Sequence, residues 1–304
     1  MKYFTLNNGN TIPQMGLGTD DVFFLHKFKS PKNRFLRKIS AGYHYIIKGY
    51  IWKRQFENSI VEALQLGYRL IDTSAAYFNE MEIGRAIRRS GIPRDQIFVT
   101  TRVTNAQQYQ GRVREAFFQS LQNLGLEYID LYMFHWPVTE HYLDTWKEME
   151  KLYQEGYVKN LGFANCHKSH IEEILKICTV RPVINQVEIH PLFTQKPLIK
   201  YCKSVGLQVE AYSPIAQNDD RMIRNRTLVS LSKKYQKSIQ QIIIRWHIEN
   251  GVIPIPRSSN SDRLKSNLDV FDFSLTSEEV NEIDKININA RKRYDPDNCD
   301  FTLL

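Results

Sequence analysis

Short apolar runs alternate with amphipathic stretches along most of the chain. The runs are rich in β-branched residues and are bounded by turn formers, which is typical of buried strands. Eight of them follow one another: Met15–Gly18, Leu70–Asp72, Ile97–Thr100, Ile129–Met133, Val158–Phe163, Val183–Val187, Leu207–Tyr212 and Val252–Ile255. Their regular spacing predicts a fold in which strands and helices alternate.

Helical periodicity fills the intervals between these runs. Apolar residues recur at three- and four-residue spacing over Val113–Leu124, before Gly125, and over Trp146–Tyr153, before Gly156. Near the end, Thr276–Glu279 has the pattern of a helix capping box. Eight strand–helix repeats with short connections favour a closed (β/α)8 TIM barrel over an open sheet.

The first residues predict a β-hairpin ahead of the barrel. Phe4–Ile12 contains Asn8-Gly9, a pair that favours a tight hairpin turn. No linker-like or low-complexity stretch divides the chain. We therefore expect an α/β fold, a (β/α)8 TIM barrel with an N-terminal β-hairpin, over residues 1–304 as one domain. The exception is an inserted loop at about residues 20–54.

Composition narrows the class of protein. The 304 residues are 42% hydrophobic, enough for a large core. The four cysteines form no CxxC pair, which argues against a disulfide framework or a zinc site and fits a reducing compartment. No apolar run approaches membrane-spanning length. We expect a soluble cytoplasmic protein without a bound metal.

Polar side chains stand at or just beyond the ends of successive predicted strands. They are Asp72, Arg102, His135, Asn165, Gln186 and Tyr212, and Tyr77 follows in the loop after the second strand. In TIM barrels the catalytic groups lie at the C-terminal ends of the strands. These side chains are therefore expected to meet at one face of the barrel.

Several motifs together resemble those of the aldo-keto reductases. The motifs are Gly67–Thr73, Tyr77–Glu80, Leu161–Asn165, Asn185–Pro191, Ala211–Pro214 and Gly251–Asn260. The resemblance covers nearly the whole chain except about residues 20–54. It implies NADPH-dependent reduction of an aldehyde or ketone, a small-molecule carbonyl substrate, to an alcohol.

The resemblance also implies a catalytic group. Tyr77 is the general acid that protonates the carbonyl oxygen as hydride arrives, and His135 orients that carbonyl. Asp72 anchors the cation at position 102. A phenol with a pKa of ~10 is a sluggish acid at neutral pH until a cation stabilises its phenolate, so these assignments are chemically reasonable.

A second set of residues is implied for NADP(H). Asn165 and Gln186 hold the carboxamide, Tyr212 stacks on the nicotinamide, and Ser213 belongs to the same site. The pocket for the adenosine end and its 2′-phosphate is formed by Arg257, Ser258, Arg263 and Asn267. Guanidinium groups match phosphate oxygens, which favours NADP over NAD.

The chain departs from the family pattern at three positions. Arg102 stands where the resemblance implies lysine, and the two are not interchangeable at a buried, hydrogen-bonded site. Ala164 replaces the usual serine, and Asp20 replaces a tryptophan that lines the substrate pocket. An alternative function therefore stays open: a catalytically impaired NADPH-binding pseudo-reductase that acts as a sensor or interaction module.

The insertion carries the positive charge of the chain. The net charge is +8, yet residues 22–56 contain nine Lys or Arg and no acidic residue, so the remainder is close to neutral. The loop follows the first strand and ends at a helix expected near Gln55. It is either a flap that steers anionic ligands, a contact for an anionic membrane surface or a partner, or a plain surface excursion. We expect no nucleic-acid partner, and a monomer or weak oligomer.

Overall fold

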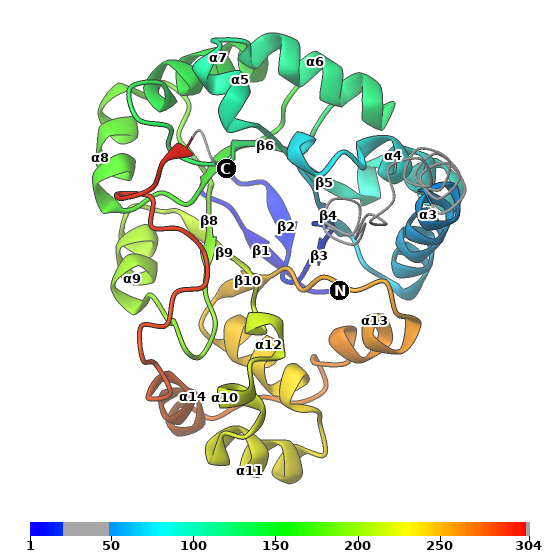
Figure 1. The fold of residues 1–304 in the computed structure, drawn as a ribbon, viewed down its shortest axis with the longest axis vertical. Helices are drawn as coiled ribbons and strands as arrows, with labels where there is room; N and C mark the ends of the chain where they lie inside the picture. Colours follow the sequence, from blue (N-terminus) through cyan, green and yellow to red (C-terminus); the bar gives the residue numbers. More distant parts are fainter. Residues whose placement is uncertain (21–48, 302–304) are drawn as a thin grey trace, which may run out of the picture.

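The computed structural model describes residues 1–20 and 49–301, and within them eight parallel strands form one sheet. Neighbouring strands pair in chain order from β3 to β10 (Figure 1). They are β3 (Leu17–Gly18), β4 (Leu70–Asp72), β5 (Phe98–Val103), β6 (Leu131–Phe134), β7 (Leu161–Ala164), β8 (Ile184–Glu188), β9 (Gln208–Tyr212) and β10 (Val252–Pro254). The expected strands are confirmed.

The first and last strands meet and close the barrel. The amide of Gly16 donates to Pro254 O at 3.0 Å, and the amide of Gly18 donates to Pro256 O at 3.2 Å. Gly18 also forms a parallel bridge with Arg257. Closure brings the segment after β3 beside the segment after β10, although more than two hundred residues separate them in sequence.

Helices surround the sheet (Figure 1). They are α3 (Gly49–Leu66), α4 (Glu80–Ser90), α5 (Asn105–Tyr109), α6 (Val113–Leu124), α7 (Tyr142–Gln154), α8 (Lys168–Ile177), α9 (Lys196–Ser204), α10 (Asp220–Ile223), α11 (Arg226–Tyr235), α12 (Ile239–Glu249), α13 (Ser261–Leu268) and α14 (Ser277–Asp284). Three 3-10 turns accompany them in the described residues: η2 (Ala75–Tyr77), η3 (Arg94–Gln96) and η4 (Ala216–Asn218). The predicted capping box of α14 is present: Thr276 Oγ1 accepts from the Glu279 amide at 3.3 Å, and Glu279 accepts from the Thr276 amide at 2.9 Å.

One helix boundary differs from the prediction. We expected the helix after the insertion to begin near Gln55, but α3 begins at Gly49. Trp52 stacks on Phe56 with ring centroids 5.4 Å apart, an (i, i+4) aromatic pair that favours an extra helical turn. Residues 21–48, which hold most of the predicted insertion, lie outside the described residues.

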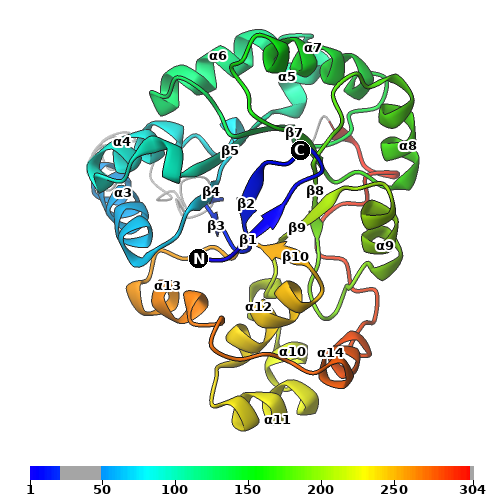
Figure 2. The same ribbon diagram turned by 180° about the vertical axis from the view of Figure 1, so that it is seen from behind.

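The N-terminal hairpin covers one end of the barrel (Figure 2). Strand β1 (Tyr3–Thr5) pairs antiparallel with β2 (Thr11–Pro13), which confirms the prediction. The side chain of Asn7 donates to Pro182 O at 2.7 Å, just before β8, and Asn8 donates to Asn160 at 2.8 Å, just before β7. Since these contacts lie at the N-terminal ends of the strands, the opposite end remains for chemistry.

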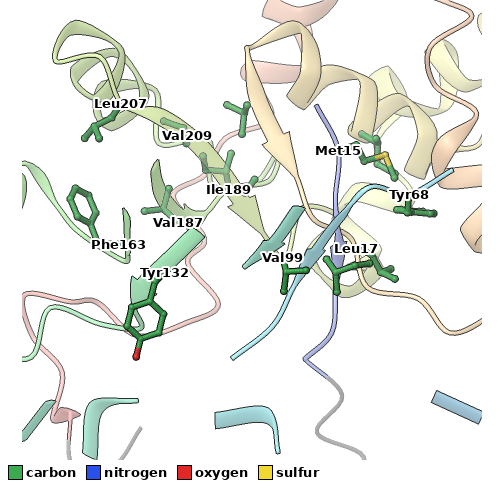
Figure 3. Packing of buried hydrophobic residues seen from close by; sticks show 14 of the residues in the cluster. Met15, Leu17, Tyr68, Val99, Tyr132, Phe163, Val187, Ile189, Leu207 and Val209 are labelled. Carbon is green, nitrogen blue, oxygen red and sulfur yellow. The ribbon is translucent and has the colours of Figure 1, made fainter. Parts of the chain in front are cut away.

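Apolar side chains of the strands pack outward against the helices (Figure 3). Phe163 of β7 meets Trp146 of α7 with ring centroids 6.0 Å apart, and Tyr132 of β6 meets Phe117 of α6 at 5.0 Å. Inside the barrel, a separate cluster that includes Leu70 joins the strands to the hairpin. None of the described helices is long and apolar enough to cross a membrane.

Candidate active site

The parallel strands bring the predicted polar residues to one end of the barrel. Asp72 is the last residue of β4, and Arg102 lies one residue before the end of β5. His135 and Asn165 directly follow β6 and β7. The remaining positions lie in or at the ends of β8 and β9: Gln186 and Tyr212.

Arg102 connects Asp72 to Tyr77. Its Nη2 pairs with both carboxylate oxygens of Asp72, and its Nη1 donates to the hydroxyl oxygen of Tyr77 at 3.3 Å. Arg102 and Asp72 are each only 2% exposed. A buried cation requires a compensating anion, and this pair supplies it. One guanidinium therefore holds a carboxylate and a phenol on two different nitrogens.

The loop that carries Tyr77 is fixed by its own hydrogen bonds. Ser74 caps η2 by accepting from the Ala76 amide at 3.2 Å, and Phe78 ends it in the left-handed region at φ 53°. The side chain of Asn79 donates to Thr19 O at 2.8 Å, which ties the loop to the end of β3. The position of the phenol is thus set by local structure.

Burial has the largest effect on the protonation of Tyr77 beside Arg102. It raises the pKa of Tyr77 above its ordinary value, and the charge of Arg102 opposes that rise. The phenol is therefore protonated at neutral pH and has a proton to donate. When the proton leaves, the charge of Arg102 stabilises the phenolate.

His135 lies beside the phenol as a neutral ring. Its ring meets that of Tyr77 edge-on, with centroids 5.9 Å apart, and its Nδ1 lies 3.4 Å from Ser74 Oγ. Burial, together with the charges of Arg102 and Arg293, lowers the pKa of His135 to about 3. A neutral imidazole has one N–H that can donate a hydrogen bond.

Gln186 extends the network to a residue that sequence reasoning missed. Its Nε2 donates to Asp72 Oδ1 and to Glu210 Oε2, each at 2.9 Å. Burial raises the pKa of Glu210 to about 8. The signal was present, because Glu210 interrupts an otherwise apolar strand run, Val209 to Ala211, and alternation places it opposite to those neighbours.

Asn165 and Tyr212 bond to each other. The hydroxyl of Tyr212 donates to Asn165 Oδ1 at 2.8 Å, and Asn165 Nδ2 donates to His135 O at 3.0 Å. Asn165 and Ser213 both adopt left-handed backbone, at φ 62° and 48°. The structure therefore brings Asn165, Tyr212 and Ser213 next to the catalytic candidates.

The candidates for the adenosine end lie apart from that group, in the segment after β10 and on α13. Arg257 Nη1 donates to Asp20 O at 2.6 Å, and Arg263 has an exposed side chain on the first turns of α13. Ser258 Oγ lies 3.4 Å from Asn260 O, and Asn267 is buried against the hydroxyl of Tyr68. Two cations thus flank the start of one helix beside the barrel end.

The C-terminal segment, which the sequence did not place, is bound to the end of β8 (Figure 1). Glu188 accepts from the amides of Lys292 and Arg293 at 2.7 and 2.8 Å, and from His190 Nε2 at 3.0 Å. Burial opposes ionisation, but the bonds from His190 and the two amides lower the pKa of Glu188. An ionised carboxylate therefore holds the tail at the active end of the barrel.

Residues 42–288 match the model of the aldo/keto reductase family. The chain belongs to this family. It is 42% identical to the 9,11-endoperoxide prostaglandin H2 reductase of Trypanosoma cruzi over 82% of this chain and 89% of the relative. It is also 42% identical to the glyoxal reductase of Bacillus subtilis, over 80% of this chain and 87% of the relative.

Solved aldo-keto reductases share the fold over nearly the whole chain. An enzyme from a Medee basin deep-sea metagenome library superimposes with a TM-score of 0.84 at 38% identity, covering 98% of this chain and 99% of the other. The Bombyx mori aldo-keto reductase in complex with NADP gives a TM-score of 0.81 at 34% identity, covering 95% and 94%. The predicted family and the barrel are therefore confirmed, and the chain is an oxidoreductase by membership of this family.

Proposed function

We propose that this aldo-keto reductase uses NADPH to reduce an aldehyde or ketone to the alcohol, with Tyr77 as the proton donor. The observation that supports this most directly is the contact between Arg102 Nη1 and the Tyr77 hydroxyl, at 3.3 Å. It places a permanent positive charge at the oxygen that becomes negative when the proton leaves. Arginine at this position is thus compatible with the chemistry of a tyrosine acid.

The residues of the site fit a dinucleotide phosphate. Gln186 Oε1 is buried and has no hydrogen-bond partner within the described part of the chain, so an acceptor is free for a carboxamide N–H. Arg257 and Arg263 are exposed cations at one helix start, suited to a 2′-phosphate. The relative from Bombyx mori binds NADP on the same fold. Ala164 offers no hydroxyl, which leaves Asn165 and Gln186 for the carboxamide.

The residues of this chain then perform the proton transfer. When bound, NADPH supplies the hydride that adds to the carbonyl carbon. The carbonyl oxygen lies between the Tyr77 hydroxyl and the neutral His135 ring, which orients it by donating a hydrogen bond. Tyr77 gives its proton to that oxygen as the carbon–oxygen double bond opens, Arg102 stabilises the phenolate, and solvent returns the proton.

Small reactive carbonyls are the first substrates to test. One relative is named a glyoxal reductase, and another, from Escherichia coli, is named a methylglyoxal reductase. These names describe those proteins. For this chain they support dicarbonyls and aldehydes as an initial panel.

A second candidate is the pseudo-reductase, and the ion pair of Arg102 with Asp72 favours it. A guanidinium that only neutralises a buried carboxylate has a structural role and takes no part in turnover. Both candidates bind NADPH, so cofactor binding does not separate them. Turnover does.

The experiment combines NADPH oxidation with NADPH binding. Tyr77→Phe is expected to lower kcat/KM roughly 100- to 10,000-fold for every carbonyl turned over, since it removes the proton donor. The dissociation constant for NADPH, measured by quenching of protein fluorescence, stays unchanged. Tyr3→Phe, on the hairpin at the other end of the barrel, is the matched control. Wild type that binds NADPH but oxidises none of it with any carbonyl would favour the pseudo-reductase.

A further inference from the structure

Arg293 extends from the end of β8 toward the end of β3. Its amide is 2.8 Å from Glu188 Oε2, at the end of β8, while its Nη2 lies 3.7 Å from Asp20 Oδ2, two residues beyond β3. Across the closure of the barrel, where β10 meets β3, strands β9 and β10 lie between those two strands. The side chain therefore passes over the end of the barrel where the catalytic candidates lie.

Asp20 is positioned from two sides. The preceding residue, Thr19, donates its amide to Asp72 O at 3.1 Å, and Arg257 donates to Asp20 O at 2.6 Å. The backbone around Asp20 is thus tied to the backbone of Asp72, at the end of β4, and to Arg257 of the candidate phosphate pocket. At this position, where the family resemblance implies a tryptophan, the chain carries a negative charge.

Asp20 and Arg293 have opposite electrostatic effects on Tyr77. Burial raises the pKa of Tyr77, Arg102 opposes the rise, and Asp20 and Arg293 act in opposite directions as weaker causes. The two side chains are 43% and 35% exposed. A half-exposed ion pair contributes little net stability, so another anion can exchange for the carboxylate.

We propose that Arg293 determines substrate specificity by binding an anionic oxygen group, carboxylate or phosphate, on the carbonyl substrate, in competition with Asp20. This rests on the proposed reductase function. A guanidinium matches such groups with two parallel hydrogen bonds, and a positive charge at the entrance also speeds encounter with anions. Neutral carbonyls of the same size bind without this contact.

The test compares matched substrates in matched variants. The pairs are para-carboxybenzaldehyde with para-nitrobenzaldehyde, and glyceraldehyde phosphate with glyceraldehyde. The first pair reports on carboxylate and the second on phosphate. Arg293→Ala is expected to lower kcat/KM for at least one anionic member about tenfold relative to its neutral partner. Asp20→Asn is expected to raise the same ratio several-fold, because Arg293 loses its competitor.

The control is Arg114→Ala, which also removes one positive charge. Arg114 pairs with Glu155 at 2.7 Å, on helices at the outside of the barrel, and its loss leaves both substrate ratios unchanged. The KM for NADPH stays constant in Arg293→Ala. An equal loss for anionic and neutral substrates, or a weaker affinity for NADPH alone, would overturn the assignment.

A binding measurement separates this inference from the proposed function. Calorimetry of benzoate and benzamide against the NADP⁺-loaded protein needs no turnover. Arg293→Ala is expected to weaken benzoate about tenfold and leave benzamide unchanged. If no carbonyl is reduced but benzoate responds in this way, the reductase proposal fails and the anion site stands. If carbonyls are reduced but Arg293→Ala leaves the affinity for benzoate unchanged, the proposed anion site is wrong and the reductase proposal stands.

Discussion

Arg102 shows how much depends on the geometry of one side chain. A lysine presents a single nitrogen, whereas Arg102 contacts Asp72 and Tyr77 through different nitrogens of one rigid plane. Its Nε, also buried, has no partner among the described residues. The contacts that the sequence led us to expect are therefore present, and the roles of these residues stay predictions.

Removing the charge of Arg102 is expected to destabilise the fold. Arg102→Met leaves Asp72 as a buried anion without its cation, so the free energy of unfolding falls by about 3–5 kcal/mol. Urea titration followed by circular dichroism measures it. The double variant Arg102→Met/Asp72→Asn recovers part of the loss. A loss below about 1 kcal/mol in the single variant would show that the pair is not a compensated buried ion pair.

At the scale of elements, periodicity predicted which helices and strands are present, but it did not predict all of their boundaries or their long-range contacts. The eight strands, the hairpin and the helix at Val113–Leu124 follow from local patterns of apolar residues and turns. The six-residue extension of α3 was not predicted, because Trp52 and Phe56 lie beside a basic stretch without apolar periodicity. The position of the C-terminal segment was not predicted for another reason. Its anchor, Glu188, lies about a hundred residues away, and nothing local marks a carboxylate as the acceptor of distant amides.

The tail is expected to loosen when Glu188 loses its charge. Glu188→Gln keeps one acceptor oxygen where two amides now donate, so one charge-assisted bond is lost, at a cost of about 1.5 kcal/mol. Hydrogen exchange at the amides of Lys292 and Arg293 then accelerates about tenfold. Mass spectrometry of peptides from this segment measures it. Glu155→Gln, on the outer surface, serves as the control, and equal exchange in the two variants would contradict the anchor.

At the scale of the whole molecule, the barrel brings together polar side chains that are far apart in sequence. Glu210, Gln186 and Asp72 come from β9, β8 and β4, yet they form one buried network. The sequence identified Asp72 and Gln186 through motifs, while Glu210 belongs to none. The sequence marks it only as a carboxylate within an apolar strand run; its partners follow from closure of the barrel, which turns the inner faces of distant strands toward one another.

Glu210 is expected to make stability depend on pH. Its pKa is about 8 in the folded protein, against an ordinary value of 4.5, so the native state keeps a proton that the unfolded chain has lost. Stability from this group is therefore full below pH 4.5 and declines as pH rises toward 8. Glu210→Gln removes that dependence.

The measurement is the difference in free energy of unfolding between wild type and Glu210→Gln, from urea titrations at two pH values. From about pH 6 to about pH 7.5, wild type is expected to lose about 2 kcal/mol of its free energy of unfolding relative to Glu210→Gln. Glu115→Gln, exposed on α6, should show no such shift. A difference that is constant with pH would mean that Glu210 is ionised in the native protein.

The central claim, that a guanidinium serves a tyrosine acid, is tested most directly by NADPH oxidation with glyoxal and aldehydes in wild type and Arg102→Lys. The account predicts turnover by wild type and about tenfold lower kcat/KM in the lysine variant. One ammonium cannot occupy both nitrogen positions, so it shifts relative to the phenol. An inert wild type beside an active lysine variant would contradict the account.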